Sequence, residues 1–202
     1  DAAPGIVGGT HAAKPPGIER VVSVDGIHWT RPAAKPVRGL GSLFTAGLPL
    51  QWDDREIAMP YALKVTDHSL QRDVLMMYYA GASRDGASGL GYASFLIGAE
   101  ARWNKHGFSP LLRGPVLYPC VVQVGETFLL WCDQQIDDRT RICRATSPDG
   151  ARWTPIDTNP VLPLGSAGEF DSHSHSMPRV LQMGRSLHMW YLGSDGKYLS
   201  KN

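Results

Sequence analysis

Apolar residues recur along this chain in short runs separated by turn residues, a pattern that predicts β-strands rather than helices. Three runs share one pattern centred on a proline: MPYALKV from Met59, YPCVVQV from Tyr118 and MPRVLQM from Met177. Successive prolines of the set, Pro60, Pro119 and Pro178, are 59 residues apart in both steps. A period of this size is typical of β-propeller blades and similar repeats.

A second strand is predicted after each proline run, in the aromatic-rich segments 75–81, 128–134 and 187–193. Third strands are predicted at 89–95 and 140–146. Asp-Gly turns followed by tryptophan complete the pattern in SVDGIHWT (23–30) and SPDGARWT (147–154). Asp-Gly favours tight turns between strands, because glycine accepts a positive φ without steric cost. Four short antiparallel strands per repeat predict a propeller blade.

The whole chain, residues 1–202, is therefore predicted to be a single all-β propeller domain. We expect about three four-stranded blades, with a partial fourth as an alternative. The repeats span about 52–112 and 113–172, and residues 18–51 pair with 173–202 to form one further blade. In this prediction the two termini share that blade and close the ring, which hides the sheet edges.

Composition excludes some function classes. Twenty basic and nineteen acidic residues leave a net charge of +1, and no basic run offers a surface for nucleic acid. No apolar stretch is long enough to cross a bilayer, and the first residues do not resemble a signal peptide. Three cysteines within apolar runs favour free thiols and a cytoplasmic location, although a removed leader stays open. The oligomeric state is left open.

The two Asp-Gly-Trp turns, the second strands MMYYAG and HMWYLG, and the stretch GEFDSHSHSMPRVL resemble the five-bladed propeller glycosidases and phosphorylases. That group includes arabinanases, xylosidases, levansucrases and invertases. The resemblance implies a substrate at the central axis, where the first strands of the blades converge and supply acids. The chain has no WMNDPNG-like, RDP or EC motif, and its nearest approach to RDP is QRDV at 71–74. No catalytic residue is therefore transferred from the group.

Candidate site residues are instead the polar groups directly before the three prolines. The predicted catalytic residues are Asp54, Glu56, Asp171, His173 and His175, and the predicted substrate-binding residues are Trp52, Arg55, Arg113 and Tyr118. Acids, imidazoles and arginines that converge on one concave surface are typical of an active site.

Three chemical interpretations are open. In a glycosidase, Asp54 or Glu56 would form a carboxylate pair with Asp171 and act on a small glycoside. In a lyase, isomerase or cyclase, His173 or His175 would transfer protons on a small molecule. A divalent metal held by His11, His173 and His175 is the third interpretation, and no other cofactor is predicted.

A carbohydrate-binding propeller without catalysis is the remaining alternative. The stretch at 168–181 bears most directly on the choice. If it is extended, His173 and His175 share one face with Asp171. The corresponding positions before the other two prolines carry no histidine. We therefore expect alanine at either histidine to abolish activity while the melting temperature hardly changes.

Overall fold

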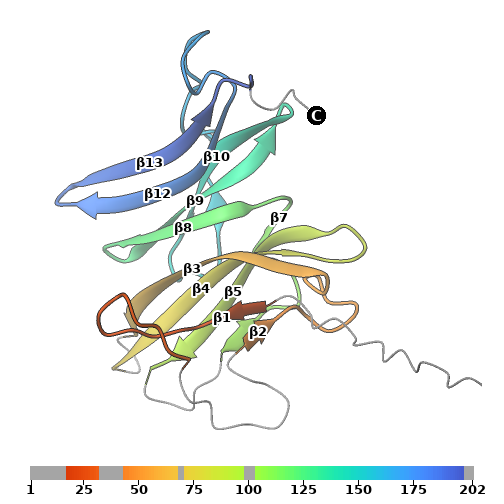
Figure 1. Ribbon diagram of the computed structural model, residues 1–202, viewed down its shortest axis with the longest axis vertical. Helices are drawn as coiled ribbons and strands as arrows, with labels where there is room; N and C mark the ends of the chain where they lie inside the picture. The colour runs from red at the N-terminus through yellow and green to blue at the C-terminus, as the bar shows by residue number, and fades with distance from the viewer. Residues whose placement is uncertain (1–16, 32–42, 68–70, 98–102, 198–202) are drawn as a thin grey trace, which may run out of the picture.

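The computed structural model describes residues 17–31, 43–67, 71–97 and 103–197, and every regular element within them is a β-strand. Figure 1 shows the strands as a stack of antiparallel sheets. In chain order they are β1 (Gly17–Glu19), β2 (Leu43–Thr45), β3 (Glu56–Asp67), β4 (Arg72–Ala82), β5 (Ser88–Leu96), β6 (Asn104–His106), β7 (Leu112–Arg113), β8 (Leu117–Val124), β9 (Thr127–Ile136), β10 (Arg139–Ser147), β11 (Thr154–Pro155), β12 (Ser174–Met183) and β13 (Ser186–Ser194). Among these residues no helix is long and apolar enough to cross a membrane.

The strands form four sheets, and three of them follow the strand order predicted from the sequence. Sheet 1 has the order β3-β4-β5-β6, with β7 also paired to β5. Sheet 2 is the four-stranded β8-β9-β10-β11, and sheet 3 is the hairpin β12-β13. A small N-terminal sheet is formed by β1 and β2. The all-β class and the consecutive antiparallel strands predicted from the sequence are therefore confirmed.

The three proline segments adopt the same local backbone. The register of each first strand shifts at its proline, between Ala58 and Tyr61, between Leu117 and Cys120, and between Ser176 and Arg179. The residue before each proline has a positive φ: 54° at Met59, 48° at Tyr118 and 57° at Met177. A positive φ is uncommon for residues other than glycine. A bulge of this kind bends the strand and turns one backbone N–H away from the ladder.

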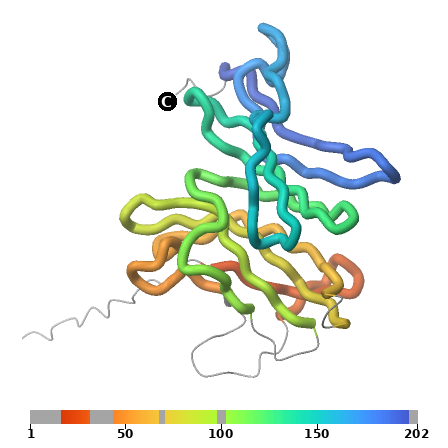
Figure 2. The backbone as a smooth tube through the Cα atoms, turned by 180° about the vertical axis from the view of Figure 1, so that it is seen from behind, coloured from red at the N-terminus to blue at the C-terminus, as the bar shows by residue number. Residues whose placement is uncertain are grey.

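The sheets pack face to face through apolar side chains. The Tyr78 face of sheet 1 packs against Val121 and Leu130 of sheet 2. The opposite face of sheet 2, around Trp131, packs against Val180 of sheet 3. This stacking places the first strands β3, β8 and β12 next to one another, with β8 in contact with both of the others. Figure 2 shows the same stack from behind.

The described strands form an open stack and not the closed ring expected from the sequence. β1 pairs with β2, and Phe44 of β2 packs edge-on against Tyr79 of sheet 1 at 5.1 Å between ring centroids. β12 pairs with β13 at the other end of the stack (Figure 1). Within the described residues no strand pairing joins the two ends, because sheets 1 and 2 lie between them. The number of blades remains a prediction.

The cysteines agree with the sequence analysis. Cys120, Cys132 and Cys143 are all buried and free. Burial raises the pKa of the Cys143 thiol, so this group stays protonated and apolar in character. These residues therefore contribute to the cores between the sheets.

Candidate active site

Polar side chains gather between sheets 2 and 3, where β12 begins. Two members come from β12, one precedes it, and one each comes from β9 and β13. We call the group the β9–β12 cluster: Asp133, Asp171, His175, Ser176 and Tyr191. The stretch at 168–181 that the sequence singled out thus supplies three of its five members.

Asp133 is the most buried carboxyl group of the cluster, with 1% of its surface exposed. Its Oδ2 accepts a hydrogen bond from Ser176 Oγ at 2.6 Å, and its Oδ1 accepts one from the backbone N of Met177 at 3.0 Å. The bulge at Met177 makes that N–H available, because it no longer belongs to the β12–β13 ladder. Burial raises the pKa of Asp133, and these two hydrogen bonds oppose the rise. The group is therefore suited to hold and donate a proton.

Asp171, His175 and Tyr191 form the second part of the cluster. The hydroxyl of Tyr191 donates a hydrogen bond to Asp171 Oδ2 at 2.6 Å, and this bond raises the pKa of Tyr191. His175 is fully buried, and its Nε2 lies 3.4 Å from Asp171 Oδ2. Neither ring nitrogen makes a hydrogen bond of good geometry. Burial lowers the pKa of His175, against the opposing effect of Asp171, so the imidazole is neutral near pH 7.

The predicted acids of sheet 1 have separate environments. Asp54 accepts backbone hydrogen bonds from Leu50 at 3.0 Å and from Arg84 at 2.9 Å, so its carboxylate ties two loops together. Glu56 is exposed at the start of β3. Arg55 is exposed beside it.

The remaining predicted residues are spread more widely. Arg113 is exposed on β7, where it pairs with Gly89 of β5. Tyr118 is half-buried at the bulge of β8. His173 is half-buried and packs beside Gly196, away from the contact between His175 and Asp171. The predicted ligand His11 lies outside the described residues.

No group of three or more His, Cys, Asp or Glu side chains that could hold a metal ion occurs in the described part of the chain. The metal set predicted from the sequence needs His11, so it stays a prediction.

Trp52 lies in a different place, at a small pocket of about 190 Å³ beside sheet 1. The pocket is lined by Gln51, Trp52, Asp53, Lys105, Gly107 and Phe108. Lys105 Nζ lies 2.6 Å from Asp53 Oδ2, and Phe108 is almost fully exposed. The exposed ring of Phe108 and the half-buried ring of Trp52, beside paired polar groups, suit a sugar ring, which presents both apolar and hydroxyl surfaces. The sequence indicated Trp52 but not Lys105 or Phe108.

Asp133 is the main group that sequence analysis missed. It ends the apolar run FLLWC, and the equivalent positions on β4 and β13 are Ala80 and Leu192. An acid in one copy where the other two have apolar residues is the signal that could have identified it.

No protein-family model and no curated protein sequence matches the chain. Solved structures do match by fold. One is Zg3597, a family 117 glycoside hydrolase from the marine bacterium Zobellia galactanivorans, with a TM-score of 0.52, 16% identity, and 67% of this chain and 48% of that chain covered. A second is a complex of BT0996 with RGII, with a TM-score of 0.58, 15% identity, and 85% and 55% covered. A third is described as a glycoside hydrolase, with a TM-score of 0.52, 15% identity, and 74% and 53% covered.

The chain is therefore similar in fold to solved glycoside hydrolases, in agreement with the family resemblance stated from the sequence. The chain spans about half the length of these structures. At such low identity the likeness concerns the fold and carries over no site residue.

Proposed function

We propose that this protein is a glycoside hydrolase that acts on a small glycoside where β3, β8 and β12 begin. The observation that carries the proposal is the buried carboxyl group of Asp133, whose pKa is raised, at the start of β12 in a glycoside hydrolase fold. A raised pKa is the property required of the acid that protonates a glycosidic oxygen.

The second carboxylate is assigned to Glu56. Among the predicted acids, Asp54 accepts a hydrogen bond from the backbone and Asp171 accepts one from a tyrosine. Glu56 is instead exposed at the start of a first strand. An exposed carboxylate at this position is accessible to water and to substrate, so it can serve as base or nucleophile. His175 and Tyr191 act in this proposal as positioning residues for the loop that leads into β12.

The test is hydrolysis of aryl arabinosides, xylosides and fructosides with and without a chelator. We expect turnover that is insensitive to the chelator and that falls by at least about a hundredfold in Asp133→Asn and in Glu56→Gln. Glu126→Gln is the matched control, because Glu126 is exposed in the β8–β9 turn at the far end of the same hairpin. Full activity in both Asp133→Asn and Glu56→Gln would refute the assignment.

Carbohydrate binding without turnover is the second candidate, and the pocket at Trp52 and Phe108 favours it. In that case glycans bind, none is cleaved, and Phe108→Ala removes binding while Asp133→Asn does not.

The histidine-dependent lyase, isomerase or cyclase stays a prediction, and it requires turnover of a non-glycosidic substrate that His175→Gln abolishes.

A further inference from the structure

Two apolar surfaces are left uncovered by the described residues, and each matches one half of a contact made inside the molecule. The internal contact joins the Asp-Gly turn at 147–154 to β4 of sheet 1. The bare surfaces are the earlier Asp-Gly turn, at 23–30, and the outward face of β12–β13.

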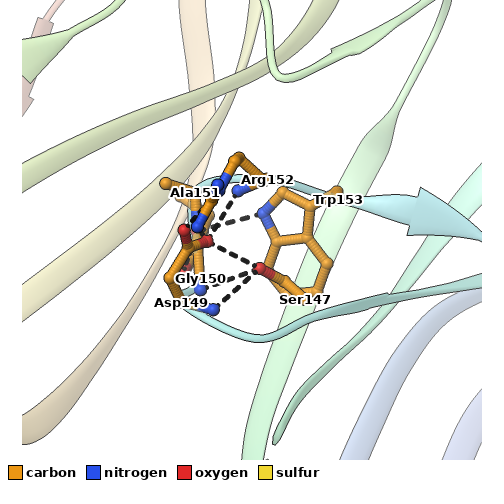
Figure 3. Close-up of polar contacts among 7 residues, drawn as sticks. Ser147, Asp149, Gly150, Ala151, Arg152 and Trp153 are labelled. Atoms are coloured by element: carbon orange, nitrogen blue, oxygen red, sulfur yellow. Dashed lines mark hydrogen bonds and ion pairs between the residues drawn. The ribbon is translucent and has the colours of Figure 1, made fainter.

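The turn at 147–154 is built by two side chains, as Figure 3 shows. Ser147 Oγ accepts a hydrogen bond from the backbone N of Gly150 at 2.8 Å. Asp149 Oδ1 accepts one from the backbone N of Ala151 at 2.9 Å. Trp153 Nε1 donates to the carbonyl oxygen of Gly150 at 3.1 Å, which fixes the indole against the turn. Gly150 has a φ of 75°, which glycine adopts without strain.

Sheet 1 provides the surface on which this turn rests. The hydroxyl of Tyr78 donates a hydrogen bond to the carbonyl oxygen of Gly150 at 2.8 Å. The ring of Trp153 packs edge-on against Tyr78 with 5.8 Å between centroids. Only 8% of Trp153 remains exposed. The indole therefore links sheet 2 to sheet 1.

The turn at 23–30 has the same hydrogen bonds to its serine and aspartate side chains. Ser23 Oγ accepts from the backbone N of Gly26 at 2.8 Å, and Asp25 Oδ1 accepts from that of Ile27 at 2.9 Å. The φ of Gly26 is 74°, close to that of Gly150 in the later turn. Yet Trp29 is 58% exposed and Ile27 is 76% exposed. The turn at 147–154 packs on a sheet through its tryptophan, whereas no described sheet covers the turn at 23–30.

The outward face of β12–β13 is the matching surface. Trp190 is paired with Arg179, the residue after Pro178, just as Tyr78 is paired with Tyr61, the residue after Pro60. On sheets 1 and 2 this face is covered by the following sheet. On sheet 3 it is bare, with more than half of each of four side chains exposed: Leu181, Met183, Trp190 and Leu192. We call these four residues the Trp190 face.

The two surfaces do not meet within one chain. In Figures 1 and 2 the turn at 23–30 lies at one end of the stack and β12–β13 at the other, with sheets 1 and 2 between them. We propose that two copies of this chain associate as a two-fold pair, with the turn at 23–30 of each copy packed on the Trp190 face of the other.

A two-fold pair of this kind makes the same contact twice and leaves neither surface bare. The inference rests on packing alone and is independent of the proposed activity.

Sedimentation velocity on the whole chain tests the proposal over about a hundredfold range of concentration, since the dimer population depends on concentration. We expect a species of twice the mass of the chain. Trp29→Glu and Trp190→Glu should each sediment as one chain with an unchanged far-ultraviolet spectrum, because both side chains are exposed in the single copy. Leu48→Glu is the control: Leu48 is 73% exposed but lies outside both surfaces, so this variant should still dimerise.

An equal mixture of Trp29→Glu and Trp190→Glu discriminates between geometries. In the proposed two-fold pair the mixture retains one intact contact, so a species of twice the mass should reappear more weakly than for the wild type. A wild type that sediments as one chain throughout would overturn the proposal. So would a dimer that survives Trp29→Glu, which would indicate two Trp190 faces packed together, or a mass that keeps growing with concentration.

Discussion

Asp53 and Asp171 occupy the same place in sheets 1 and 3, although 118 residues separate them. Each lies seven residues before the proline of its first strand. Each accepts a hydrogen bond from a tyrosine at the equivalent position of the second strand, Tyr79 at 3.0 Å and Tyr191 at 2.6 Å. The repetition favours a structural role for both carboxylates: each holds the loop before its first strand against the sheet.

The neighbourhood of the two carboxylates is repeated as well. An aromatic ring precedes each aspartate and stacks on the tyrosine, Trp52 on Tyr79 and Phe170 on Tyr191, with 6.0 Å between centroids in both cases. His175 is the feature that only sheet 3 has, since its counterpart before Pro60 is Ile57. What distinguishes the β9–β12 cluster is therefore the imidazole and Asp133, not Asp171.

Removing the tyrosine hydroxyls tests this structural role. Tyr191→Phe should lower the free energy of unfolding by about 1–3 kcal/mol, because a buried carboxylate loses its donor. Tyr79→Phe should cost less, since Asp53 keeps its ion pair with Lys105 at 2.6 Å. Urea unfolding measures both. Two variants as stable as the wild type would show that the hydroxyl bonds contribute nothing to folding.

Local features of this fold were predictable from sequence, since a proline run or an Asp-Gly turn specifies its own backbone. Contacts between sheets were not. Asp133 acquires its partners only when β12 packs beside β9. The shared face of Asp171, His173 and His175 assumed an extended strand, whereas β12 begins at Ser174 and Asp171 lies in the preceding turn. His175 consequently packs against Tyr191, while His173 packs beside Gly196.

The burial of His175 changes the stability expected for its variants. Truncation of a fully buried ring leaves a cavity, so His175→Ala should cost about 2 kcal/mol rather than leave the melting temperature unchanged. His173→Ala, at a half-buried position, should cost less than about 1 kcal/mol. Thermal unfolding of the two variants side by side gives the comparison, and equal losses would contradict the different environments.

The stability contribution of His175 should depend on pH. Burial lowers its pKa in the folded chain below the ordinary value of 6.5, so the unfolded chain takes up the proton first as pH falls. The wild type should therefore lose stability relative to His175→Gln between pH 6.5 and the lowered pKa. Urea unfolding at several pH values measures the difference. A constant difference would mean that folding leaves the pKa of His175 unchanged, and a difference that moves the other way would mean that Asp171 stabilises the imidazolium form.

The two Asp-Gly turns give a matched pair of tryptophan variants. Trp153→Ala should lower the free energy of unfolding by about 3–5 kcal/mol, because the indole is buried between sheets 1 and 2. Trp29→Ala should change it by less than about 0.5 kcal/mol at concentrations where the chain is a single copy. Chemical unfolding at low concentration tests both, and a large loss in Trp29→Ala would show that residues 23–30 are buried within one chain.

The raised pKa of Asp133 can be tested through the pH dependence of stability, without an activity assay. Its pKa is raised by burial above the ordinary value of 3.8, so the folded chain releases the proton later than the unfolded chain as pH rises. The wild type should therefore lose stability relative to Asp133→Asn as pH rises from 3.8 through the raised pKa, and the difference should be constant above it. Glu126→Gln, at an exposed position, should track the wild type throughout. If the wild type instead gains stability over Asp133→Asn across that range, the bonds from Ser176 and Met177 hold an anion, and Asp133 is not the proton donor.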